Sequence, residues 1–176
     1  VAGALSMINP EDIHKVEVIR GGSSSIYGSK AMGGVVQVFT SNGQYSPSLN
    51  FSGSTTTGYQ SANQLFNQHL NLAVENNNWF IELSGSNRNA GDLITPDGIL
   101  SNSSFNDQSA SIHAGFKPDE RQEIRLNFQY FHGWDIGIPG GALFPPAATV
   151  QYRKADRNLF SLNYSISDLS GLFEEI

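Results

Sequence analysis

The sequence predicts a mainly β protein in which a short α+β stretch precedes roughly six or seven antiparallel strands. Three observations lead to this prediction. The composition changes near Asn42, from a compact mixed stretch to segments rich in serine and asparagine. Beyond that point apolar and polar residues alternate with a period of two, as they do in strands with two different faces. Short and long connections between these segments also alternate, which is typical of a series of hairpins.

The first part of the chain predicts a helix start followed by two strands. Residues 9–12 read Asn-Pro-Glu-Asp, and each residue type suits the start of a helix: a cap, a proline at the first position and acidic groups in the first turn. The helix is expected to be short, because β-branched residues follow at once and predict a strand over 14–20. A Gly/Ser turn then leads to a second strand over 35–40.

The later strands are predicted from the alternation alone. They span 49–59, 66–74, 79–88, 110–116, 124–130 and 160–166. The connections predicted to be tight are 76–78, 117–122 and 168–171, whereas 88–107 and 133–154 are predicted to be long loops and 59–64 a brief one. If the first strand rises from the side of the α+β stretch, the tight turns share one end of the sheet and the long loops share the other.

Parity also predicts the register of one hairpin. Pairing Val74 with Ile81 and Leu70 with Gly85 keeps apolar residues on one face. This register leaves a two-residue turn at 77–78, for which asparagine predicts type I′.

The direction of the apolar face separates two kinds of protein. In a soluble β-sandwich this face points into a core, whereas in a membrane barrel it meets lipid and the polar face lines the lumen. The alternation is compatible with both. Aromatic residues at strand ends favour the membrane barrel, because interfacial girdles lie there; these residues are Tyr59, Trp79, Phe116 and Tyr130.

Composition excludes several function classes. The net charge is -6 and no stripe of Lys or Arg occurs, which argues against a nucleic-acid surface. With no cysteine, the chain has neither disulfides nor a thiolate metal site. The first residues lack the basic and apolar regions of a signal peptide, and both ends are expected to be internal to a longer protein.

Residues 8–40, INPEDIHKVEVIRGGSSSIYGSKAMGGVVQVFT, closely resemble the end of the plug domain in TonB-dependent outer-membrane receptors. The residues that match the family pattern are Ile13, Val16, Glu17, Val18, Arg20, Gly21, Tyr27, Gly28, Ala31, Gly33, Gly34 and Val35. Gly22 stands where the family usually has proline, and Gln37 where it usually has asparagine.

The resemblance implies the end of an α+β plug domain at 1–41, followed at 42–176 by the first strands of a transmembrane β-barrel of about 22 strands. It implies a Gram-negative outer membrane, contact with its lipid, and active uptake of an iron–siderophore complex without a cofactor. The partner is the TonB complex, which acts through an N-terminal box absent from this chain. Cobalamin is the alternative ligand, and a passive porin-like channel or a soluble β-sandwich binding module are the alternative functions.

The resemblance assigns structural or gating roles to part of the plug motif. Arg20 is expected to pair with barrel-wall glutamates beyond this chain, and the Tyr27 hydroxyl to bond a polar partner. Glycines are expected where turns are tight or φ is positive; these are Gly21, Gly28, Gly33 and Gly34.

Several residues are candidate ligand contacts or metal ligands. Val1 and Ser6 correspond to the tail of a plug loop that lies near the ligand. In the predicted loop 133–154 the candidates are Trp134, Asp135, Tyr152 and Arg153, with Trp134 alternatively an interfacial anchor.

A calcium site is a minor alternative in the predicted loop 88–107, where the ligands would be Asp92, Asp97 and Asp107, against an ordinary polar loop. His69 and His113 fall on the polar face and are expected to line the lumen. No catalytic constellation can be assembled, so no catalytic residue is predicted.

Overall fold

The computed structural model describes residues 7–8, 10–21, 33–40, 43–140 and 149–167. The chain divides into two compact units, Val1–Asn42 and Gly43–Ile176, which we describe separately. Within the described residues, no helix has the length and apolar character needed to cross a membrane.

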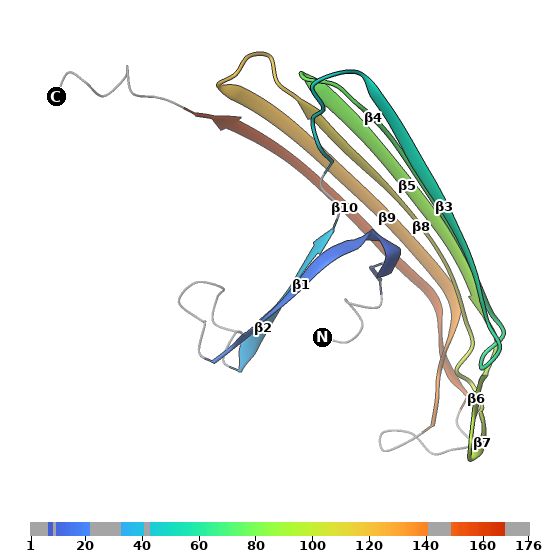
Figure 1. Cartoon of the computed structure of the whole chain (residues 1–176). Helices are drawn as coiled ribbons and strands as arrows, with labels where there is room; N and C mark the ends of the chain where they lie inside the picture. The colour runs from blue at the N-terminus through green and yellow to red at the C-terminus, as the bar shows by residue number, and fades with distance from the viewer. Residues whose placement is uncertain (1–6, 9, 22–32, 41–42, 141–148, 168–176) are drawn as a thin grey trace. The chain divides into compact units, whose positions relative to one another are not determined.

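The first unit contains an antiparallel hairpin. Strand β1 (Ile13–Arg20) pairs with β2 (Gly34–Thr40), and a 3-10 turn, η1 (Pro10–Asp12), precedes them (Figure 1). The two predicted strands are confirmed. The predicted helix is a single turn, because strand-forming residues begin immediately after Asp12; the proposed cap, Asn9, lies outside the described residues.

The second unit contains a six-stranded antiparallel sheet, which Figure 1 shows as a strongly curved ribbon. Each strand pairs with its neighbour in chain order, except that a small hairpin is inserted between the third and the fourth. The strands are β3 (Asn50–Gln60), β4 (Leu65–Glu75), β5 (Trp79–Ala90), β8 (Phe105–Phe116), β9 (Gln122–Ile138) and β10 (Val150–Ile166), and the inserted hairpin is β6 (Leu93–Thr95) with β7 (Gly98–Leu100).

The register predicted from parity is confirmed. Val74 pairs with Ile81 and Leu70 with Gly85. The turn between β4 and β5 has two residues at its tip, but the predicted type I′ is wrong, because neither Asn77 nor Asn78 has the positive φ that type I′ requires.

The Asn76 side chain explains why this turn needs no positive φ. Its Oδ1 accepts hydrogen bonds from the backbone N–H groups of Asn78 (2.8 Å) and Trp79 (2.9 Å). In the turn between β8 and β9, the Asp119 Oδ1 atom likewise accepts hydrogen bonds from the backbone N–H groups of Arg121 (2.8 Å) and Gln122 (2.9 Å). The Arg121 amide is the main reason that the pKa of the Asp119 carboxyl lies below its usual range. Both tight turns are therefore held by a side-chain cap.

We expect Asn76→Ala to destabilise the protein by about 1 kcal/mol, since it removes the acceptor of two N–H groups. Asn76→Asp retains that acceptor and is the matched control. Urea unfolding measures the change in the free energy of unfolding in both variants. Equal losses in the two would show that the cap contributes nothing.

The longest strands correct the predicted loops. β9 and β10 each have 17 residues and extend well into the range predicted as a loop at 133–154. β5 and β8 likewise shorten the loop predicted at 88–107. Ladder hydrogen bonds continue here after the hydrophobic alternation has ended, because backbone pairing does not depend on which side chains face lipid or core. Tyr130, predicted at a strand end, accordingly lies in the middle of β9.

In this sheet the apolar face is exposed and the polar face is buried, which is the reverse of a soluble domain. Large apolar side chains on one face keep 39–48% of their surface exposed; they include Leu70, Leu72, Ile81, Leu83 and Ile112. The polar side chains that alternate with them along the strands, and so lie on the opposite face, are buried; they are His69, Glu82, Asp107, Ser111 and His113. This arrangement contradicts the soluble β-sandwich, in which the apolar face would be the buried one. We call the apolar side the outer face and the polar side the inner face.

Candidate functional site

The inner face of the sheet is held by hydrogen bonds between neighbouring strands. Ser84 and Ser111 approach to 2.8 Å between their hydroxyl oxygens, and Ser86 and Ser109 to 2.7 Å. Glu82 accepts from the Asn71 carboxamide at 2.8 Å. A buried carboxylate is tolerated when it is hydrogen-bonded, so Glu82 can be buried in this polar wall.

An ion pair lies farther along the same face, towards the long connections. Arg88 of β5 donates two hydrogen bonds to Asp107 of β8, from Nε at 2.8 Å and from Nη2 at 2.7 Å. The side chains are 19% and 6% exposed. The guanidinium also lies 5.5 Å from the ring centroid of Phe105. This bidentate geometry fixes the register of β5 against β8 at that height.

The segment that enters β3 is anchored to the inner face around Phe80. A Cβ at Gly43 would lie 2.0 Å from the Phe80 ring, and one at Gly115 would lie 2.1 Å from it, so both positions require glycine. Gly43 also has a φ of +58°, and its N–H donates to the Glu82 carboxylate at 3.1 Å. Tyr45 packs edge-on against Phe80, with ring centroids 5.0 Å apart.

Tyr45 is held as a neutral phenol. Burial raises its pKa to about 12, and the neighbouring Glu123 carboxylate contributes in the same direction. The Lys117 ammonium lies 4.0 Å from the Tyr45 ring centroid, within cation–π range. The ring thus joins the entry segment to the turn between β8 and β9.

Hydrogen bonds tie the connections at the opposite end of the sheet to one another. The Asn102 carboxamide donates to the carbonyls of Ile138 (2.7 Å) and Val150 (2.6 Å), and so bridges the ends of β9 and β10. Asn102 has a φ of +61°, which asparagine tolerates better than most residues. Ile94 donates its N–H to the Ala62 carbonyl at 2.6 Å, which links the first connection to the β6–β7 hairpin. These contacts make one cluster, which we call the loop cluster: residues 61–64, 91–104 and the ends of β9 and β10.

Asp92 secures the loop cluster through its carboxylate. One oxygen accepts the N–H groups of Ser103 (2.8 Å) and Ser104 (3.0 Å). The Ser103 amide is the main cause that lowers the pKa of Asp92 below the ordinary value of 3.8.

We expect this anchor to weaken in acid. Because the folded pKa is depressed, the stabilisation is present above the unfolded value of 3.8 and is lost as the pH falls through the lower folded value. Amide hydrogen exchange of Ser103 and Ser104, corrected for intrinsic rates, should lose protection over that window. Asp92→Asn has no ionisable group and should show no such step; a step of the same size in this variant would contradict the assignment.

The candidate ligand contacts predicted in the loop 133–154 lie in strands. Trp134 and Asp135 lie in β9, and Tyr152 and Arg153 lie in β10, so their placement in a loop is wrong. Trp134 stacks on His132 with ring centroids 5.3 Å apart, and has the same parity as Tyr130 on the outer face. A strand position on that face fits the interfacial anchor better than the ligand contact. Val1 and Ser6 lie outside the described residues.

The three aspartates weighed as a calcium site are not gathered. Asp107 lies in β8 and pairs with Arg88, whereas Asp92 binds backbone amides. Asp97 lies in the turn between β6 and β7. In the described ranges no group of three or more His, Cys, Asp or Glu side chains could hold a metal ion. The structure therefore does not bring these three aspartates together.

The plug-motif residues are only partly described. Gly21 and Gly34 have φ values of +103° and +140°, so the expectation of positive φ holds at these two, whereas Gly33 has no such φ. A Cβ at Gly34 would lie 2.5 Å from the Ile19 carbonyl oxygen. Arg20 ends β1 as an exposed residue paired with Gly34. Tyr27 and Gly28 lie outside the described residues.

Sequence reasoning missed Phe80 and Asn102. Phe80 did leave a signal, because a large aromatic residue stands at a polar-face position of β5, and the alternation therefore breaks there. Asn102 left none, since its partners Ile138 and Val150 are distant in the chain and it lies in a polar stretch.

Comparisons with known proteins point to one family. Residues 2–35 match the family model of the TonB-dependent receptor plug domain. The chain is 29% identical over 157 residues to the rhizobactin receptor of Rhizobium meliloti strain 1021, a match that covers 80% of this chain and 21% of that protein. It is 29% identical over 136 residues to the TonB-dependent receptor SusC of Bacteroides thetaiotaomicron, a match that covers 66% of this chain and 12% of that protein.

A solved structure shares the fold. The chain matches the copper transporter OprC with a TM-score of 0.76 at 20% identity, over 93% of this chain and 24% of that one. The chain therefore spans a quarter or less of the length of each of these three proteins.

Proposed function

We propose that this chain, whose residues 2–35 match the plug-domain model of TonB-dependent receptors, forms part of a transporter that takes up an iron–siderophore complex across the outer membrane of a Gram-negative bacterium. In this proposal residues 1–41 are the end of the plug and residues 42–176 are the first part of the barrel. The protein that carries them is energised by the TonB complex and is not an enzyme.

One observation carries the proposal: a plug-domain sequence leads into a sheet whose apolar side chains are exposed and whose polar side chains are buried. Such a sheet is stable when lipid covers the apolar face, and in a barrel the polar face then lines the lumen. The tight turns capped by Asn76 and Asp119 lie at one end of this sheet, and the loop cluster lies at the other. Short periplasmic turns and longer external connections are the arrangement found in outer-membrane barrels.

One comparison supports the choice of substrate. The similarity to the rhizobactin receptor supports an iron–siderophore complex. The loop cluster, at the external end of the sheet, is the surface that we propose for contact with the ligand. The plug motif at Arg20, Gly21, Tyr27, Gly28, Gly33 and Gly34 would form part of the gate.

Uptake by the complete receptor tests the proposal. A strain that lacks the receptor gene is complemented with it, and uptake of radiolabelled ferric siderophores and of labelled cobalamin is measured with and without functional TonB. We expect saturable siderophore uptake that disappears without TonB. Uptake of cobalamin without uptake of ferric siderophore would show that cobalamin is the substrate. Uptake that persists without TonB would indicate a passive channel and overturn the proposal.

Matched variants connect uptake to this chain. Asn102→Ala removes the bridge between the ends of β9 and β10 and should weaken ligand affinity by loosening the loop cluster. Asn76→Ala, at the opposite end of the sheet, should leave ligand affinity unchanged. Equal losses of affinity in both variants would assign the effect to general stability and not to the loop cluster.

A further inference from the structure

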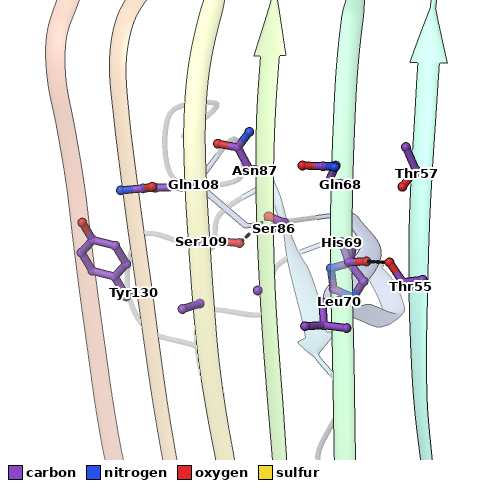
Figure 2. Close-up of a pocket in the computed structure, with 12 residues that line it drawn as sticks. Thr55, Thr57, Gln68, His69, Leu70, Ser86, Asn87, Gln108, Ser109 and Tyr130 are labelled. Atoms are coloured by element: carbon purple, nitrogen blue, oxygen red, sulfur yellow. Dashed lines mark hydrogen bonds between the residues drawn. The ribbon is translucent and has the colours of Figure 1, made fainter.

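A depression of about 610 Å³ lies in the described sheet, and most of the residues around it have the parity of the outer face (Figure 2). Its floor is formed by Gly85 of β5 and Ala110 of β8, which pair with each other. Leu70 of β4 and Tyr130 of β9 rise on either side. The hollow exists because two small residues stand between two large ones in a single cross-strand row.

A row of carboxamides borders the hollow on the side of the long connections. Gln68 pairs with Asn87, which pairs with Gln108, so the three side chains stand on adjacent strands (Figure 2). All three are exposed. Within the described part of the chain, no hydrogen bond of these three side chains to another residue is seen.

The next row on the other side of the hollow is apolar. Leu72, Leu83 and Ile112 pair in sequence across β4, β5 and β8, and all are among the exposed large apolar residues. The depression therefore lies where the outer face changes from apolar to polar. Its apolar end is continuous with the surface that the proposed function places in lipid.

The residues around the depression determine which lipid headgroups can bind there. Among the described residues around the depression there is no Asp, Glu, Lys or Arg, so a charged headgroup has no counter-ion there. A carboxamide both donates and accepts hydrogen bonds. An amide or hydroxyl group does the same, whereas an ester only accepts. Where lipid covers these exposed carboxamides they lose their hydrogen bonds to water, so a ligand that both donates and accepts hydrogen bonds is favoured there.

We propose that this depression binds the acyl chain of an outer-leaflet lipid whose chain is hydroxylated and joined through an amide. The hydrocarbon occupies the hollow over Gly85 and Ala110. The amide and hydroxyl groups bond Gln68, Asn87 and Gln108. The site rests on the proposed function only in that the outer face meets lipid.

Native mass spectrometry of the purified receptor with defined lipids tests the site. The probes are an amphiphile with an amide-linked 3-hydroxyacyl chain and an ester-linked phosphatidylglycerol of equal chain length. We expect wild type to retain the amide-linked probe about tenfold more strongly, the effect of one or two additional hydrogen bonds. Equal retention of the two probes would overturn the assignment.

Filling the hollow should abolish retention of both probes. Gly85→Leu is suitable because a Cβ there would meet only the Ser109 carbonyl oxygen, at an ordinary 3.7 Å. Ala114→Leu, in the same outer face but away from the depression, is the matched control and should bind as wild type does. If Gly85→Leu also binds as wild type does, the depression is not the site.

Replacing the carboxamides separates the two parts of the site. The triple variant Gln68→Leu, Asn87→Leu, Gln108→Leu should still retain lipid but should lose the preference for the amide-linked probe. A preference that persists would overturn the role of the carboxamides.

A receptor dimer that disappears in Gly85→Leu would show that a second copy occupies the surface, and would overturn the lipid site. The uptake assay is independent of these readouts, so its failure would leave lipid retention as a separate result.

Discussion

Asp107→Ala is expected to destabilise the receptor by about 3 kcal/mol, the lower end of the range for breaking a buried ion pair. The loss arises because Arg88, whose side chain is only 19% exposed, would keep its charge without the carboxylate that accepts two of its hydrogen bonds. Urea unfolding in lipid bilayers measures the change.

Two further variants test this explanation. Replacing both partners, Arg88→Met with Asp107→Leu, should recover most of the loss, since it removes the unpaired charge along with the pair. Lys154→Ala breaks an exposed ion pair with Asp156 in the same sheet and should cost far less than Asp107→Ala, because solvent screens exposed charges. If the double variant is as unstable as Asp107→Ala, the loss reflects packing and not the unpaired charge.

Leu72→Lys is expected to cost about 2–4 kcal/mol, the range for a lysine near the bilayer midplane on the lipid side of a barrel. Leu72 is 48% exposed and has apolar cross-strand neighbours on the outer face, so a charge placed there would enter hydrocarbon. The fraction of receptor that reaches the folded, heat-modifiable form in the outer membrane should fall accordingly, and unfolding in bilayers gives the free energy.

The matched control is Ser54→Lys. Ser54 is an exposed residue of β3 that pairs with Asn71 on the inner face, where a charge meets polar groups. It should cost far less than Leu72→Lys. Should the lysine be tolerated at position 72 and rejected at 54, the assignment of the two faces would be reversed.

Much of the sheet could be predicted from the sequence, because a shift of one residue would move every apolar side chain to the other face. The pairing of Val74 with Ile81 follows from this constraint alone, and the structure confirms it. The hairpin of the first unit followed from β-branched residues on both sides of a Gly/Ser turn.

The ends of the strands could not be predicted in the same way. Beyond Tyr130 the alternation fades, with Gly133 and the positive φ of Asp135 at +49°, yet β9 continues to Ile138. Backbone pairing with β10 maintains the strand there, and the sequence carries no sign of it. The turn at Asn77 was also misjudged, since a side-chain cap replaced the backbone conformation that asparagine suggested.

The candidate site was even less accessible from the sequence. Phe80 fits between Gly43 and Gly115, which lie on different segments, and Asn102 reaches partners on β9 and β10. The hollow over Gly85 and Ala110 is lined by residues of five strands and depends on their common register. Such contacts require the complete fold, so only the polar and apolar identity of each face was predictable.

Accessibility measurements along β4 test the central claim, that the apolar face meets lipid, most directly. The chain has no cysteine, so single cysteines can be placed at positions 68–74 of a receptor freed of any other cysteine and then spin-labelled in bilayers. Exposure to dissolved oxygen should peak at 70, 72 and 74, where a water-soluble nickel chelate should not reach, and should fall at 69, 71 and 73. If the nickel chelate reaches 70, 72 and 74 instead, the apolar face meets water and the transporter account is wrong.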